Sequence, residues 1–295
     1  MRAMVKAISL PIEEVIMSQW ITEEQTPHLR LSAEAEAVLY SGESEFQKIE
    51  VFKSKEYGMM LALDGVFQTS EREEFIYHEM IAHVPLFLHP NPERVLIIGG
   101  GDGGVARECV RHDCVKEVTM VEIDGKVVEL AKQYLPTISK AMIENNPKLT
   151  VKIGDGIGFM AEAEDYYDVI IVDCSDPIGP GEGLFTEKFY KNTLKALKAD
   201  GLFVQQTESP MLHQPLVEKV FGYVNNHFPI ARLYTAYIPI YPAGMHCFTV
   251  GSKKYDPLTW EPNREQNFET KYYNKDIQKA AFALPNFVKN YLPNK

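Results

Sequence analysis

Acidic residues recur in this chain directly after predicted buried strands, at Asp102, Glu122, Asp155, Asp173 and Asp176. In an open α/β sheet the carboxyl ends of the parallel strands meet at one edge, where ligands bind. These side chains are therefore expected to form one strongly negative cleft, suited to a polycation. A single acid at a strand end is often a helix N-cap, and for Asp155 capping and ligand binding are equally open interpretations.

Asp173 and Asp176 place two carboxylates three residues apart in a loop rich in proline and glycine. One carboxylate could accept a proton while the other holds a distant ammonium group. The same spacing also suits Mg²⁺, which prefers oxygen ligands. Because no lysine or phosphate-binding backbone accompanies the pair, the prediction is an ammonium site without a metal.

The segment that positions these acids is residues 94–122, which reads as an apolar run, a glycine-rich turn, a helical stretch and a second apolar run ending in Glu122. Gly99, Gly101 and Gly104 fit the pattern G-x-G-x-x-G. In such units the glycines let a ligand approach bare backbone, and the acid accepts hydrogen bonds from a ribose. The segment therefore predicts an adenosine-binding α/β unit.

Asp102 is unusual inside this glycine turn, because it puts a negative charge where the pyrophosphate of a dinucleotide would lie. The turn therefore favours a nucleoside that bears positive charge, such as a sulfonium, over NAD or ATP. Residues 154–156, Gly-Asp-Gly, fit the adenine edge. The carboxylate can accept from the exocyclic amine, and the glycines leave room for the ring.

The rest of the chain reads as a small antiparallel β region followed by alternating helices and strands. Residues 1–45 are weakly patterned, but 46–52 alternate with period two, and short strands are predicted at 59–63 and 66–69. A capping box, Ser70-x-x-Glu73, predicts a helix that ends before Pro85. Further helices are predicted at 126–134, 186–197 and 215–226, strands at 149–153, 167–172 and 202–206, and an antiparallel edge at 230–238 and 245–250.

Composition narrows the class of protein. The 295 residues suffice for one large α/β domain and a small appendage, divided as 1–70 and 71–295. The net charge of −11 argues against a nucleic-acid partner, which favours a basic footprint. Four cysteines without C-x-x-C spacing indicate reduced thiols. We expect no signal peptide and no membrane span, and hence a cytoplasmic protein.

Several motifs together resemble the spermidine synthase (polyamine aminopropyltransferase) family, over the chain from Trp20 onward. They are LIIGGGDGG, VEID, GDG, DCSDPIGP, DGVFQTSEREEFIYHEM, IPIYPAGM and YYN…AAFALPNF. The resemblance implies a small N-terminal antiparallel β domain before a Rossmann-like, methyltransferase-type doubly wound sheet of the α/β class. It also implies aminopropyl transfer from decarboxylated S-adenosylmethionine to putrescine, with release of methylthioadenosine. A homodimer or homotetramer without a tightly bound cofactor is expected.

The resemblance also assigns roles to single residues. Asp173 is implied as the catalytic base, with Tyr77 beside it, and Asp102 and Asp173 as the residues that hold the aminopropyl amine. Glu208 is a less secure candidate for the acceptor pocket. The residues implied to bind the nucleoside part of the cosubstrate are Gln47, Gly99, Gly101, Glu122, Asp155, Gly156 and Pro180. Those implied to line the polyamine groove are His78, Ser175, Asp176, Tyr241, Gln68 and Trp20.

Alternatives remain at this point. A lone Trp20 suits a core or interface as well as a ligand, and a helix histidine such as His78 is more often packed or solvated than a ligand. A small-molecule methyltransferase, a nicotinamide-dependent oxidoreductase or a non-catalytic polyamine-binding module could share part of the pattern. The acceptor could also be agmatine, cadaverine or a longer amine.

Overall fold

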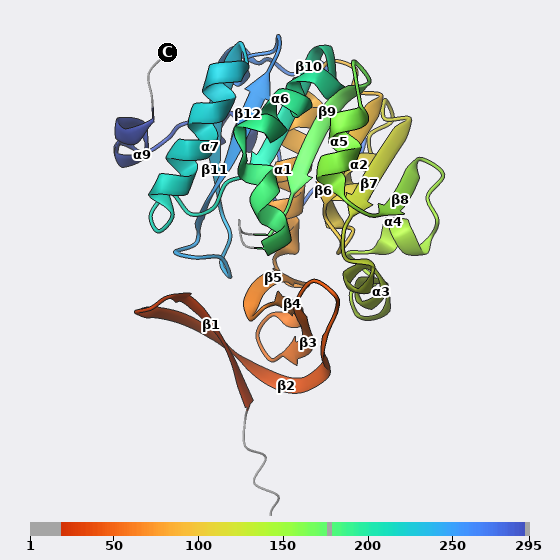
Figure 1. Cartoon of the computed structure of the whole chain (residues 1–295), viewed down its shortest axis with the longest axis vertical. Helices are drawn as coiled ribbons and strands as arrows, with labels where there is room; N and C mark the ends of the chain where they lie inside the picture. Colours follow the sequence, from red (N-terminus) through yellow and green to blue (C-terminus); the bar gives the residue numbers. More distant parts are fainter. Residues whose placement is uncertain (1–18, 176–178, 293–295) are drawn as a thin grey trace, which may run out of the picture.

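The computed structural model describes residues 19–175 and 179–292. For residues 179 and 180 it describes the backbone alone. The described chain forms two sheets, a smaller N-terminal one and a larger one that carries helices on both faces (Figure 1). The smaller sheet is antiparallel, in sequence order. Its strands are β1 (Gln19–Thr26), β2 (Leu29–Glu43), β3 (Lys48–Ser54), β4 (Gly58–Leu63) and β5 (Val66–Ser70).

The strands predicted from the sequence include the last three of this sheet but not β1 and β2. Most side chains of both strands are exposed, and in β2 only Ala33 and Ala35 are buried. β1 has no period of two, whereas residues 29–37 of β2 do alternate apolar and polar residues, a signal that the prediction left unused. That the two sheets are separate domains, divided at residue 70, stays a prediction.

The larger sheet has the order β11-β12-β10-β9-β6-β7-β8. β12 runs antiparallel to both of its neighbours, and the other pairings are parallel, which confirms the predicted antiparallel edge. The class is therefore α/β with a small antiparallel sheet at the N-terminus. The strands are β6 (Arg94–Gly99), β7 (Glu117–Glu122), β8 (Leu149–Ile153), β9 (Tyr167–Asp173), β10 (Leu197–Gln206), β11 (Ile230–Tyr237) and β12 (Met245–Ser252).

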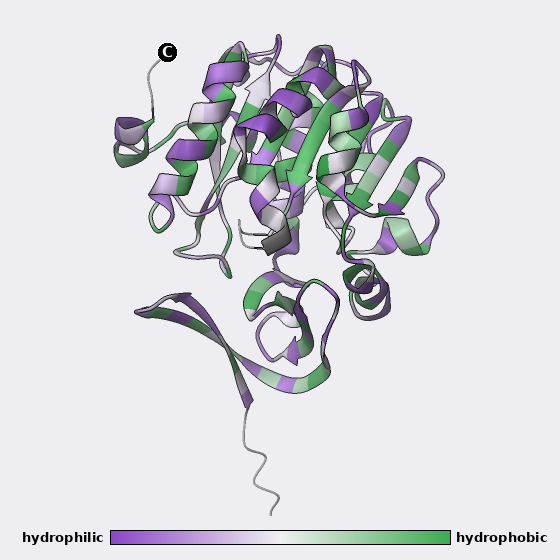
Figure 2. Ribbon diagram, viewed as in Figure 1, coloured by the Kyte–Doolittle hydropathy of each residue, from purple (hydrophilic) through white to green (hydrophobic). Residues whose placement is uncertain are grey.

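Helices cover both faces of this sheet because its buried strands are apolar on both sides. In β6, Val95 and Ile97 pack under one layer and Leu96 and Ile98 under the other, and the apolar strands lie inside more polar helices (Figure 2). The first layer holds α1 (Glu74–Leu88), α2 (Gly104–Val110) and α8 (Lys275–Ala281), and the second α5 (Gly156–Glu162), α6 (Glu187–Ala196) and α7 (Gln214–His227). The remaining helices are α3 (Gly125–Tyr134), α4 (Lys140–Ile143), α9 (Asn286–Tyr291), η1 (Gly179–Phe185) and η2 (Pro257–Thr259).

The predicted end of the first helix is wrong. α1 continues past Pro85 to Leu88, although proline removes one intrahelical hydrogen bond. The last turn is buried, and tail residues satisfy its carbonyls: Trp260 donates its indole N–H to Phe87 O at 3.0 Å, and Arg264 contacts Leu86 O. Within the described residues, no helix combines the length and apolarity that crossing a membrane requires.

Candidate active site

A cavity of about 330 Å³ lies at the carboxyl edge of the larger sheet, where the smaller sheet approaches it. Strand ends and turns of both sheets supply its walls, as expected for a ligand site of an α/β fold. Most predicted site residues line this one cavity. They are Gln47, Gln68, Tyr77, His78, Gly99, Gly101, Asp102, Glu122, Asp155, Gly156, Asp173, Ser175, Tyr241 and also Glu208.

Among the described side chains, one predicted site residue, Trp20, does not line the cavity, and two more predicted residues fall in the part of the chain that is not fully described. Trp20 lies on β1 and is 58% exposed, so its side chain faces solvent in the single chain. Pro180 lies in the backbone of η1, and its side chain is outside the described part. Asp176 lies outside the described residues altogether.

Asp173 ends β9 and accepts a hydrogen bond of 2.6 Å from the hydroxyl of Tyr77 on α1. Its backbone carbonyl accepts from Gly100 N at 2.8 Å, which ties the glycine turn to β9. Gly99 has φ +84°, and a Cβ there would lie 2.0 Å from Asp173 O. Only glycine tolerates that conformation and that approach.

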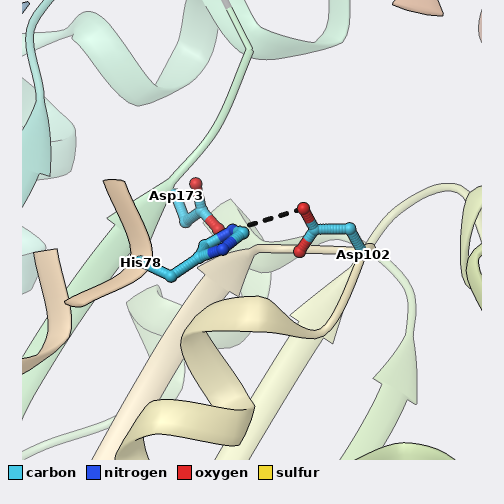
Figure 3. Close-up of side chains that lie close together, drawn as sticks. All are labelled: His78, Asp102 and Asp173. Atoms are coloured by element: carbon cyan, nitrogen blue, oxygen red, sulfur yellow. Dashed lines mark ion pairs between the residues drawn. The ribbon is translucent and has the colours of Figure 1, made fainter. Parts of the chain in front are cut away.

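Asp102 and His78 meet beside Asp173, as Figure 3 shows. The Nε2 of His78 lies 3.3 Å from Asp102 Oδ2, and Asp102 Oδ1 accepts from Gly104 N at 2.8 Å. On the far side of the ring, His78 Nδ1 lies 2.5 Å from Glu74 Oε2. The imidazole therefore stands between two carboxylates.

The third glycine of the motif makes room for this histidine. A Cβ on Gly104 would lie 2.3 Å from Cε1 of His78 and 2.4 Å from its Nδ1. Such distances are far inside van der Waals contact. The glycine spacing thus accommodates a side chain of α1 as well as a ligand, which the sequence pattern alone does not indicate.

Burial and charge shift the titration of these groups in opposite directions. Burial raises the pKa of Asp173 to about 6, and the Asp102 carboxylate adds to the shift. Burial also opposes charge on His78 and Asp102, but their attraction outweighs it. The pKa of His78 is therefore well above, and the pKa of Asp102 below, its ordinary value. Burial beside the Asp173 charge raises the pKa of Tyr77, so its phenol keeps its proton.

Glu122 lies at the end of β7, deeper in the cavity. Burial raises its pKa to about 7, and its Oε1 accepts from Asp124 N at 2.8 Å. Gln47, from the loop before β3, donates its amide to Asp124 Oδ2 at 2.9 Å. This contact joins the smaller sheet to the predicted ribose site.

Asp155 caps α5, accepting from Ile157 N at 2.8 Å and Gly158 N at 3.1 Å. The capping interpretation is thus confirmed. The same side chain also lines the cavity, so capping does not exclude ligand binding. At Gly156 a Cβ would lie 2.6 Å from Ile98 Cγ2, which explains the glycine by packing.

The opposite end of the cavity is also acidic. Tyr241 donates its hydroxyl to Gln68 O at 2.7 Å, which links the loop before β12 to β5. Glu208 lines the cavity nearby with φ +65°, and His213 Nδ1 lies 3.2 Å from its Oε2. Burial raises the pKa of Glu23 to about 7, and the charge of Glu208 adds to this.

Sequence reasoning missed two of these acids. Glu23 is buried on the otherwise exposed strand β1, where it accepts from Phe67 N at 2.9 Å. Glu74 is buried at the start of α1. In the sequence both resemble ordinary surface glutamates. The burial of Glu23 is apparent only in the folded chain, so no sequence signal identifies it.

His78, Asp102 and Asp173 present one ligand atom each within 4.8 Å of one another, a spacing that a metal ion could bridge. A metal needs a free nitrogen lone pair on the histidine. Although burial opposes it, the carboxylates of Asp102 and Glu74 hold the pKa of His78 well above its ordinary value, so both ring nitrogens carry protons and neither offers a lone pair. The cluster therefore fits an ion-pair network better than a metal centre.

Comparison with known proteins identifies relatives over nearly the whole chain. Residues 74–260 match the spermine/spermidine synthase domain, and residues 19–71 match the spermidine synthase tetramerisation domain. Polyamine aminopropyltransferase of Bacillus cereus is 53% identical over 272 residues, which cover 92% of this chain and 98% of the relative. The Bacillus subtilis polyamine aminopropyltransferase is 50% identical over 273 residues, with the same shares covered.

Two solved structures are similar to this chain over nearly its whole length. A spermidine synthase in complex with the transition-state analogue AdoDATO superposes with a TM-score of 0.91 at 41% identity, covering 95% of this chain and 98% of the other. Spermidine synthase from Thermotoga maritima superposes with a TM-score of 0.88 at 40% identity, covering 95% and 97%.

Proposed function

Because this chain belongs to the spermine/spermidine synthase family, we propose that it transfers the aminopropyl group of decarboxylated S-adenosylmethionine to putrescine, giving spermidine and methylthioadenosine. The observation that carries this proposal is the hydrogen bond between buried Tyr77 and half-buried Asp173, beside Asp102. A proton acceptor and a cation site thus adjoin the glycine turn. The nicotinamide-dependent and non-catalytic alternatives do not account for this combination.

The nucleoside part of the donor occupies the deeper end of the cavity. Glu122 accepts from the ribose hydroxyls, and Gln47 lies at the entrance to this part, held by Asp124. Asp155 and Gly156 flank the adenine. Pro180 completes this list as an expectation from the family resemblance.

Asp102 and Asp173 hold the ammonium of the aminopropyl arm. Ordinary S-adenosylmethionine carries a carboxylate beside that amine, which would meet two acids in a largely desolvated site, at a cost on the order of several kcal/mol. Decarboxylation removes the repulsion. A small-molecule methyltransferase would gain nothing from this pair of acids around the amino-acid end.

Asp173 is the base of the reaction. An amine with a pKa of ~10.4, the value for lysine, is free base in only about one molecule in two thousand at pH 7, so attack needs a proton acceptor. Asp173 is ionised above its pKa of about 6, and Tyr77 orients it. The freed nitrogen attacks the methylene carbon beside sulfur, the carbon–sulfur bond breaks, and neutral methylthioadenosine leaves. The sulfonium is a good leaving group, so positioning and proton removal suffice and no tightly bound cofactor is required.

The acceptor occupies the groove between β5 and the loop before β12, which holds Gln68, Tyr241 and Glu208. Its second ammonium meets Glu208, with Glu23 behind it. A diamine, with an ammonium at each end, matches a cavity lined by Asp102 and Asp173 on one side and by Glu208 on the other. His78, Ser175 and Asp176 complete the groove by resemblance, whereas Trp20 on exposed β1 is better placed to meet another subunit.

The match of residues 19–71 to a tetramerisation domain supports an oligomer. We propose a homodimer or homotetramer assembled through β1 and β2, whose outer faces carry four of the exposed large apolar side chains. These are Trp20, Leu29, Val38 and Leu39.

The test is release of methylthioadenosine from decarboxylated S-adenosylmethionine, with putrescine, agmatine, cadaverine and spermidine compared as acceptors. Putrescine is expected to give the highest kcat/KM. Asp173→Asn is expected to lower kcat by about 10²–10⁴, whereas Asp165→Asn, an exposed acid on the loop before β9, leaves it unchanged. Release with none of the amines contradicts the transferase, and undiminished release in Asp173→Asn removes that residue as the base.

A further inference from the structure

His78 has a carboxylate against each of its ring nitrogens. Nδ1 lies 2.5 Å from Glu74 Oε2, Nε2 lies 3.3 Å from Asp102 Oδ2, and the residue is 2% exposed. Asp102 belongs to the substrate site described above. Glu74 does not line the cavity and has no role in the reaction so far.

Glu74 is fixed in place by Arg107 on α2. The guanidinium donates to both carboxylate oxygens, at 3.0 and 2.8 Å, and its Nε donates to Glu108 at 2.7 Å. A bidentate pair of this kind restricts orientation as well as charge. Glu74 is therefore a rigid anion that reaches the site only through the His78 ring.

A neutral imidazole has one N–H and one lone pair. If Nδ1 donates to Glu74, the lone pair of a neutral ring would point at the Asp102 carboxylate in a buried site, which is repulsive. A proton on each nitrogen satisfies both contacts. The other charged or titratable groups around the ring are Tyr77 in an edge contact at 5.5 Å between ring centroids, Glu73, Asp173 and Arg107.

We propose that His78 is an imidazolium in the empty site and loses its Nε2 proton to solvent when the donor's ammonium binds Asp102. The ring keeps its Nδ1 proton toward Glu74, and the Nε2 lone pair then accepts an N–H of the ammonium. One cation replaces another at the same carboxylate. Glu74 and Arg107 are positioning residues, because they determine which nitrogen keeps its proton.

The charge balance favours this exchange. The donor brings an ammonium and a sulfonium, and Asp102 and Asp173 carry two negative charges to meet them. An imidazolium that stayed would direct its Nε2–H at the ammonium on Asp102 and so place two like charges side by side in a buried site, which is unfavourable. The inference rests on the proposed function, because it takes decarboxylated S-adenosylmethionine as the ligand.

Titration calorimetry tests the exchange. Decarboxylated S-adenosylmethionine is titrated near pH 8, above the titration of Asp173 and Glu122, in two buffers that differ in ionisation enthalpy. The dependence of the heat on the buffer should show about one proton released per donor bound, and donor affinity should rise about tenfold per pH unit while His78 is charged. Methylthioadenosine, which lacks both cationic groups, should bind without release.

Two variants locate the proton. Glu74→Gln keeps a hydrogen-bond acceptor but not the charge, and His78→Gln cannot be charged. Both should bind methylthioadenosine as the wild type does, and both should bind the donor without proton release and with an affinity independent of pH. If Glu74→Gln does not fold, His78→Gln decides the question.

Failure of the proton exchange and failure of the proposed function would give different results. Turnover together with donor heats that are the same in both buffers overturns the proton exchange and leaves the transferase intact. Release that persists in both variants also overturns it, because the proton then comes from another group. No donor binding together with no methylthioadenosine release overturns both the exchange and the proposed function.

Discussion

Asp173 has to hold a cation in one step, which favours a low pKa, and accept a proton in the next, which favours a higher one. Its surroundings shift the pKa in both directions. Burial and Asp102 raise its pKa to about 6, whereas the hydrogen bond from Tyr77 and the charge of His78 lower it. The carboxylate is therefore basic enough to take a proton but still ionised at neutral pH. Acid protonates it and removes the base.

Tyr77→Phe should move the acidic limb of the pH–rate profile. In the wild type, kcat/KM for the donor should fall more steeply once the pH is lowered below about 6, where Asp173 takes up a proton. Loss of the hydroxyl removes a hydrogen bond that favours the carboxylate, so the limb should shift to higher pH and kcat should fall about tenfold. Tyr272→Phe, a change in the tail, is the control. An unshifted limb in Tyr77→Phe contradicts the role of the hydrogen bond.

The acids that follow strands could be predicted from the sequence because topology gathers strand ends at one edge, and Asp102, Glu122, Asp155 and Asp173 do line one cavity. Glu74 could not be predicted as a site residue. Its importance comes from contacts with His78 and Arg107, and a sequence pattern does not contain contacts between side chains of different elements.

At the scale of elements, the glycine turn does two things. Gly99 allows the turn to approach β9, and Gly104 leaves room for the His78 ring at the start of α2. The turn and α1 therefore fit against each other before any ligand arrives. The G-x-G-x-x-G pattern predicted the turn correctly, but it gave no indication that one glycine serves an imidazole.

Gly104→Ala should therefore impair donor binding more than nucleoside binding. The added methyl group would displace His78 from its place between Glu74 and Asp102. We expect a fall of about 1–3 kcal/mol in the free energy of unfolding and a higher KM for the donor, with methylthioadenosine affinity nearly unchanged. Gly222→Ala on α7, where no atom lies within 4 Å of the added carbon, is the matched control. An unchanged donor KM contradicts this account.

α1 also anchors the tail on its other side. Glu79 is buried and accepts from the backbone N–H groups of Lys271, Tyr272 and Tyr273 at 2.8, 2.8 and 2.7 Å. The helix that carries Tyr77 and His78 is thus held between the site and the C-terminal segment. This docking also explains why α1 can extend beyond Pro85, because tail residues satisfy its last carbonyls.

Glu79→Gln should loosen this docking. An amide presents one acceptor oxygen in place of two charged ones, so at least one buried N–H loses its partner, at about 2–3 kcal/mol of unfolding free energy. Hydrogen exchange at residues 271–273 should accelerate. Glu261→Gln, which removes an exposed ion pair with Lys279, should change neither quantity. Unaltered exchange in Glu79→Gln would show that the tail is held by its apolar contacts alone.

Strong periodic segments were predictable, and segments whose structure depends on the rest of the molecule were not. The strands of the larger sheet are apolar runs that can be recognised directly in the sequence. β1 and β2 lack such runs because little of their surface is buried. The rule that proline ends a helix failed at Pro85 for a related reason. Side chains of the tail bind the carbonyls of the last helical turn and so stabilise a turn that the local sequence alone would not form.

At the scale of the whole molecule, the smaller sheet contributes to the site and also presents an uncovered apolar surface. Gln47 and Gln68 line the cavity, while Val38 and Leu39 on β2 are exposed. Large apolar side chains left exposed beside one another on a strand are typical of a contact surface. Assembly and the integrity of the site are thus expected to depend on the same sheet.

Leu39→Glu should therefore disrupt the oligomer. A charge placed in an apolar interface is desolvated without a partner, so sedimentation velocity should show a smaller species than the wild type at equal concentration. Leu258→Glu, at an exposed position of η2, should sediment as the wild type does. An unchanged distribution in Leu39→Glu contradicts assembly through this face.

The buried carboxyl groups have a consequence for the lifetime of the protein. Burial raises the pKa values of Asp173, Glu122 and Glu73 to about 6, 7 and 7, so at these three groups the folded chain binds more protons than the unfolded chain. Their stabilising contribution is complete below about pH 4 and is lost as the pH rises toward 7. At neutral pH the ionised carboxylates of the empty site outnumber the His78 imidazolium and repel one another, and the cationic donor relieves this repulsion when it binds. We therefore expect the donor-free protein to unfold and be degraded before the donor-bound form, so its half-life should follow the supply of its own cosubstrate.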